Sequence, residues 1–125
     1  MPKGKTIMQV ASNEGTSLAL ASDSTVYAWG HNNYGQLGDG TNTNSNVPVA
    51  VKTTGTPMDG KRIVQVVYNL AHSLALASDG TVYSWGDNTH GQLGNGTTIN
   101  YTVPVATSTT GNSALAPSTP KITIG

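Results

Sequence analysis

Residues 73–96, SLALASDGTVYSWGDNTHGQLGNG, decide the fold, because residues 17–40, SLALASDSTVYAWGHNNYGQLGDG, are a near copy of them. Over residues 17–55 and 73–111, 27 of 39 paired positions are identical, with no gap between the copies. Internal repetition of this kind indicates one structural unit that is used twice.

The division of the chain follows from this repeat. We assign residues 1–55 to a first unit and residues 56–111 to a second. The remaining residues, 112–125, are small and proline-containing, which predicts a linker-like tail, and residues 121–125 (KITIG) resemble a short terminal strand.

The first run that the two units share, Leu-Ala-Leu-Ala, alternates with a period of two and predicts a strand with leucines on one face and alanines on the other. A second strand follows, in which Tyr and Trp share one face and a valine shares the other with a small residue. With two further strands, each unit reads as about four strands. The predicted core residues are Leu18, Leu20, Trp29, Leu37, Leu74, Leu76, Trp85 and Leu93.

Turns and edges are also marked in the sequence. Asp79-Gly80 lies between two alternating runs and predicts a tight antiparallel hairpin, with Asp23-Ser24 at the matching place in the first unit. Pro48 and Pro104 each interrupt a valine-rich run, and proline restricts such a strand to a sheet edge or a strand start.

The run SDGTVYSWGDNTHGQLGNGT, followed by VPV, resembles the repeat of the RCC1 family, and it looks more like the bacterial, Asn/Thr-rich members than the eukaryotic nucleotide exchange factor. The resemblance implies an all-β fold of two four-stranded antiparallel β-propeller blades. A complete propeller of this family is a ring of seven blades, so it also implies that two blades leave their end faces uncovered. Exposed apolar faces are usually interaction surfaces, and two different, complementary faces favour a head-to-tail contact that closes into a ring or continues as a filament.

Composition limits the function. Six basic and six acidic residues give no net charge, which disfavours a nucleic-acid partner. Cysteine is absent, no apolar stretch is long enough to cross a membrane, and no catalytic, phosphate-binding or metal-binding motif occurs. We therefore expect no enzyme activity, cofactor, metal, nucleic-acid partner or membrane partner. The Thr, Asn, Ser and Gly content is common in extracellular bacterial proteins.

The sequence favours a non-catalytic scaffold that binds other copies of itself, with a second protein bound through the blade-connecting loops. Loops on a rigid scaffold usually carry binding, and the two copies diverge most just after each tryptophan. The candidate partner-binding residues are His31, Asn33, Tyr34, Asp87, Thr89 and His90. The alternatives are drift on a solvent-exposed turn for these residues, and for the chain a structural subunit of an extracellular filament. A ligand or enzyme site at the ring centre has the least support.

Overall fold

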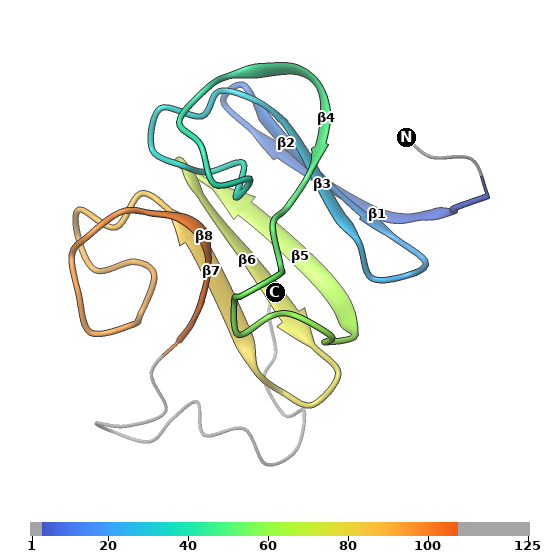
Figure 1. The fold of residues 1–125 in the computed structure, drawn as a ribbon. Helices are drawn as coiled ribbons and strands as arrows, with labels where there is room; N and C mark the ends of the chain where they lie inside the picture. Colours follow the sequence, from blue (N-terminus) through green and yellow to red (C-terminus); the bar gives the residue numbers. More distant parts are fainter. Residues whose placement is uncertain (1–3, 108–125) are drawn as a thin grey trace.

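Two four-stranded antiparallel sheets, one for each repeat, form the part of the chain that the computed structural model describes, residues 4–107 (Figure 1). The predicted tail at residues 112–125 lies outside the described residues. The first sheet has the strand order β1 (Ile7–Asn13), β2 (Thr16–Ala21), β3 (Val26–Gly30) and β4 (Ser45–Ala50). The second has the order β5 (Ile63–Asn69), β6 (His72–Ala77), β7 (Val82–Gly86) and β8 (Tyr101–Ala106). The predicted all-β fold of two four-stranded antiparallel units is therefore confirmed.

The hairpin turns lie where the sequence predicts them. The Ala21 amide donates to the Thr25 carbonyl at 2.9 Å, and the matching bond in the second sheet, from Ala77 to Thr81, is also 2.9 Å. The turn needs a positive φ, which is 89° at Gly80 and 72° at Ser24. Glycine adopts this conformation without steric cost, whereas serine does not.

The two prolines lie in edge strands. Pro48 is in β4 and Pro104 is in β8, and each of these strands pairs with only one neighbour in its sheet. Proline lacks the amide that a central strand would use for a second ladder. The restriction of these strands to an edge is thus confirmed.

Each sheet has two different faces. In the first sheet, cross-strand pairs join Leu18 to Ala28 and Leu20 to Val26, and we call this side the leucine face. On the other side of the second sheet, Ala75 pairs with Tyr83 and Ser73 with Trp85, and we call this side the tryptophan face. Because side chains alternate along a strand, each sheet carries both faces.

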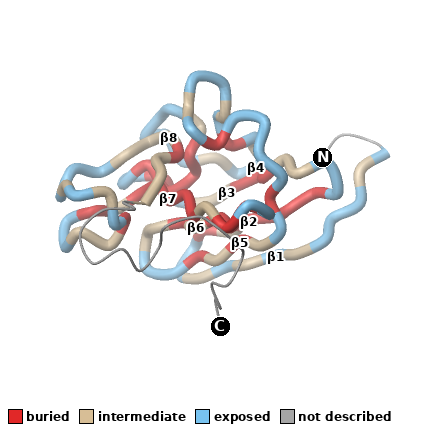
Figure 2. The backbone as a smooth tube through the Cα atoms, turned by 90° about the horizontal axis from the view of Figure 1, so that it is seen from below, coloured by how far each residue is buried: buried red, intermediate tan, exposed pale blue. Residues whose placement is uncertain are grey.

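The core lies between the two sheets. Its buried cluster combines the leucine face of the first sheet with the tryptophan face of the second and with the inner side of β5. In Figure 2 the buried segments follow the central strands of both sheets, whereas β1 is only intermediate or exposed. Stacking the two sheets therefore buries one face of each. The buried cluster consists of Leu18, Leu20, Val26, Ala28, Leu37, Val51, Met58, Ile63, Val66, Tyr68, Ala75, Ala77, Tyr83 and Trp85.

Candidate interaction surfaces

The contact between the sheets centres on the Trp85 indole, which is completely buried. Its Nε1 donates to the Gln36 carbonyl at 3.0 Å, and the Ser73 hydroxyl donates to the same carbonyl at 2.9 Å. Gly38 lies against the indole, because a Cβ built there would be 2.6 Å from Trp85 Nε1. A loop of the first sheet thus covers the tryptophan of the second.

Two side chains of the first sheet bind the backbone of β5. The Gln9 side chain accepts from the Val66 amide and donates to the Val66 carbonyl, both at 2.8 Å. The Ser24 hydroxyl accepts from the Ile63 amide at 3.0 Å. These bonds supply partners for the exposed edge of the second sheet, where unpaired backbone groups would otherwise face solvent.

On the tryptophan face of the first sheet, no residue within 4–107 covers Trp29 and Val10 in this way. Val10 is 69% exposed and Ile7 is 38% exposed, whereas their counterparts in the second sheet, Val66 and Ile63, are 1% and 5% exposed. The Trp29 side of this sheet carries a hollow of about 600 Å³, which we call the Trp29 hollow. Its lining residues are Gly15, Trp29, Gly30, His31, Asn44, Ser45 and Asn46.

Six of the eight predicted core residues are buried, namely Leu18, Leu20, Leu37, Leu76, Trp85 and Leu93. Trp29 and Leu74 differ from the expectation, because each is only half-buried. Trp29 lies on the uncovered tryptophan face of the first sheet, and Leu74 occupies in the second sheet the position that Leu18 has in the first. For Trp29 and Leu74, burial therefore depends on what packs against the position and not on residue type alone.

The six candidate partner-binding residues lie in the two loops that follow β3 and β7, three in each loop. Asp87 is half-buried and the other five are exposed, namely His31, Asn33, Tyr34, Thr89 and His90. Asp87 Oδ1 accepts from the amide and the hydroxyl of Thr89, at 3.0 and 2.6 Å. Among the described residues, no hydrogen bond joins one group of three to the other. Each group is therefore a separate exposed surface on its own loop.

Two asparagines that the sequence patterns did not indicate organise these loops, Asn32 and Asn88, and both are fully buried. Asn32 Oδ1 accepts from the Leu37 amide at 2.8 Å, and its Nδ2 donates to the carbonyls of Thr41 and Thr43 at 2.9 and 3.1 Å. Asn88 makes the same set of bonds 56 positions later. The signal was available, because this asparagine is the one identical position in the four-residue segments HNNY and DNTH.

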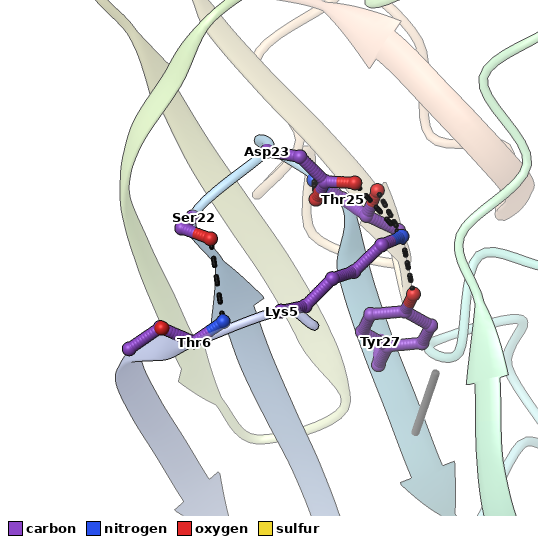
Figure 3. Close-up of polar contacts among 6 residues, drawn as sticks. All are labelled: Lys5, Thr6, Ser22, Asp23, Thr25 and Tyr27. Carbon is purple, nitrogen blue, oxygen red and sulfur yellow. Dashed lines mark hydrogen bonds and ion pairs between the residues drawn. The ribbon is translucent and has the colours of Figure 1, made fainter. Parts of the chain in front are cut away.

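An ion pair lies at the β2–β3 turn, and another lies at the equivalent β6–β7 turn. Lys5 Nζ lies 2.8 Å from Asp23 Oδ2 and donates to the Tyr27 hydroxyl at 2.9 Å (Figure 3). In the second sheet, Lys61 Nζ lies 3.1 Å from Asp79 Oδ2. Hydrogen bonds from Lys5 and from the Thr25 backbone lower the pKa of Asp23 from 3.8 to about 2.

The same lowering occurs in the second sheet, where hydrogen bonds from Thr81 and from Lys61 bring the pKa of Asp79 to about 2. A carboxyl group whose pKa is lower in the folded state stabilises the fold above its unfolded pKa, and this contribution is lost as pH falls through the folded value. Acid should therefore remove the stabilisation that the Asp23 and Asp79 carboxylates give to the fold.

We expect the difference in unfolding free energy between the wild type and Asp23→Asn to be largest above the unfolded pKa of 3.8. It should shrink as pH falls through about 2, where the native carboxyl is protonated. Urea melts over this pH range measure the difference. Asp59→Asn is the control, because Asp59 forms no ion pair among the described residues, and a pH-independent difference for Asp23→Asn would contradict the expectation.

Within residues 4–107, no three His, Asp or Glu side chains gather in a way that could hold a metal ion. No helix in that part of the chain is long and apolar enough to span a bilayer.

The chain has one four-stranded antiparallel sheet per repeat, with the strands in sequence order, and its two sheets pack face to face as neighbouring blades of a β-propeller do. The chain belongs to the RCC1 repeat family. A family model described as Regulator of chromosome condensation (RCC1) repeat matches residues 23–76 and 79–118, and a second model with the same description matches residues 7–36 and 63–92. The resemblance seen in the sequence is thus confirmed.

Three similar proteins show how much of a longer protein such a chain covers. The E3 ubiquitin-protein ligase HERC2 of Homo sapiens is 40% identical over 95 residues, which are 76% of this chain and 2% of HERC2. The structure of human WBSCR16 matches with a TM-score of 0.76 and 27% identity, over 86% of this chain and 26% of that one. Prp20p of Saccharomyces cerevisiae, described with binding properties to Gsp1p and histones, matches with a TM-score of 0.75 and 21% identity, over 91% and 28%.

Proposed function

We propose that this chain is a non-catalytic β-propeller module that serves as a protein-interaction scaffold and that it completes its blade contacts by binding other copies of itself. The observation that carries the proposal is the contrast between Val10, 69% exposed, and the equivalent Val66, 1% exposed. A patch that is buried in one repeat and open in its near copy is suited to association.

Association of this kind is head to tail, because the uncovered face of the first blade differs from the uncovered face of the second. Such contacts generate closed rings when the rotation closes and filaments when it does not. Three chains would form a ring of six blades and four chains a ring of eight. The filament remains the second candidate, and it uses the same contact.

The exposed loops after β3 and β7 are the proposed surface for a different protein. His31, Asn33 and Tyr34 lie on one loop, and Asp87, Thr89 and His90 on the other. Variable side chains on a rigid scaffold suit partner recognition. Prp20p, which has the same fold, is described as binding Gsp1p and histones. That likeness supports a protein partner in general and carries over no residue of that interface.

Light scattering after size exclusion, over a wide range of protein concentration, tests self-association. A ring should give one discrete mass of three or four times 12.8 kDa. A filament should give masses that grow with concentration. A mass of 12.8 kDa at every concentration would contradict self-association, since the uncovered blade faces would then remain open in solution.

A further inference from the structure

We propose that the Trp29 hollow receives residues 91–96 of a second copy of this chain, which we call the 91–96 loop. This inference rests on the self-association proposed above and identifies the two surfaces that meet. The first blade already presents the matching loop, residues 35–40, to the second blade within one chain. The same contact, displaced by one repeat, joins two chains.

The contact within the chain shows what the hollow is built to hold. The Gly40 amide donates to the Thr102 carbonyl at 2.9 Å, and a Cβ built on Gly35 would lie 2.8 Å from the Tyr101 carbonyl oxygen. A Cβ built on Gly86 would lie 3.2 Å from Gln36 Cα. The loop after β3 therefore lies directly on the second sheet, whereas the loop after β7 projects away from the first (Figure 1).

The Trp29 hollow consists of the same positions in the first repeat. Trp85, Gly86, Tyr101 and Thr102 receive the 35–40 loop, and 56 positions earlier stand four of the residues that line the hollow, namely Trp29, Gly30, Ser45 and Asn46. The Trp29 hollow is thus the first-repeat counterpart of the surface that the 35–40 loop covers in the second repeat.

Both the Trp29 hollow and the 91–96 loop carry hydrogen-bonding groups that have no partner among the described residues. Within residues 4–107, neither Trp29 Nε1 nor the Ser17 hydroxyl makes a hydrogen bond, although Trp85 Nε1 and the Ser73 hydroxyl both donate to the Gln36 carbonyl. The Gln92 carbonyl, the counterpart of that acceptor, accepts none in the same part of the chain. Two donors and one acceptor therefore match across the two ends.

The 91–96 loop also has the required shape. Its sequence GQLGNG differs from GQLGDG at residues 35–40 in a single residue. The φ angles of Gly94 and Gly38 are 69° and 71°, and those of Gly96 and Gly40 are 85° and 86°. A buried asparagine binds the leucine amide in both loops, at 2.9 Å for Leu93 and 2.8 Å for Leu37. The loop is therefore held in the docking conformation before it docks.

Two glycines of this loop make a matched test. Gly94→Ala places a Cβ 3.5 Å from Thr107 in the free chain, which is an ordinary contact. After docking, the same Cβ would meet Trp29 as a Cβ at Gly38 would meet Trp85, at 2.6 Å. Gly96→Ala is the control, because it adds a similar positive-φ strain, while its counterpart Gly40 has no neighbour closer than 3.6 Å.

Sedimentation equilibrium of the wild type and of each variant measures the association constant. We expect Gly94→Ala and Trp29→Ala each to weaken association by about tenfold or more, and Gly96→Ala to change it by about twofold or less. An equimolar mixture of Gly94→Ala and Trp29→Ala should form 1:1 dimers, since the intact hollow of one fits the intact loop of the other. Trp29 emission should shift to the blue with concentration in the wild type but not in Gly94→Ala.

The outcomes separate the two proposals. If the wild type associates and Gly94→Ala associates equally well, the 91–96 loop is not the occupant of the hollow, although self-association stands. If the two variants fail to pair when mixed, the docking contact is not head to tail and the inference is overturned. If the wild type is monomeric at every concentration, self-association itself is wrong and the docking falls with it.

Discussion

Trp85→Ala should lower the free energy of unfolding by about 3–5 kcal/mol, because it removes a fully buried indole from the contact between the blades. It also leaves the Gln36 carbonyl without one of its two donors. Trp29→Ala makes the same chemical change at the equivalent position, where the indole is half-buried and forms no hydrogen bond to any described residue, so its cost should be about half as large or less. Urea unfolding followed by circular dichroism measures both values.

The comparison is made at a protein concentration below the onset of association, since association would bury Trp29 and raise its cost. Equal losses for the two variants under that condition would contradict the burial seen in the structure. A rise in the cost of Trp29→Ala with concentration, with Trp85→Ala unchanged, would in turn support docking at the Trp29 hollow.

Asn32→Ala should lower the free energy of unfolding by about 2–4 kcal/mol, because it leaves the buried Leu37 amide without its acceptor and removes the two bonds to the carbonyls of Thr41 and Thr43. The neighbouring substitution Asn33→Ala is the control. Asn33 is exposed, and among the described residues its side chain makes one long hydrogen bond, of 3.5 Å to Gln36, so the change should cost about 0.5 kcal/mol or less.

Hydrogen exchange gives a second readout for this pair. In Asn32→Ala the amide of Leu37 should lose protection, since Asn32 Oδ1 is its hydrogen-bond acceptor. In Asn33→Ala that amide should stay protected. Equal stability of the two variants would mean that the buried asparagine does not hold the loop.

Much of the fold could be predicted from local pattern. The two-residue alternation of Leu-Ala-Leu-Ala sorts side chains by face, and the register that joins Leu18 to Ala28 shows that sorting. The Asp-Gly pair marked the hairpin at Gly80, and Pro104 marked an edge strand. Each of these features depends on neighbours within a few residues, so a single sequence contains it.

The loops were harder to predict, because long glycine-rich segments have no periodicity. The role of Asn32 depends on bonds to residues 5 to 11 positions away, which no local pattern specifies. The β5–β6 turn is another case. There Leu70 and Ala71 take positive φ values of 44° and 71°, although neither residue favours them. The first repeat has Gly15 in place of Ala71, with φ of 90°.

By itself, the sequence determined that one four-stranded unit occurs twice, where its turns and edges lie, and which side chains share a face, because these properties follow from residue type and spacing. Only the tertiary structure decided which of two equivalent tryptophans is core. Trp29 and Trp85 stand in the same local sequence, yet Trp85 is buried and Trp29 is half-buried. The reason is physical: burial depends on what packs against a face, and the 35–40 loop covers Trp85 while no described residue does the same for Trp29.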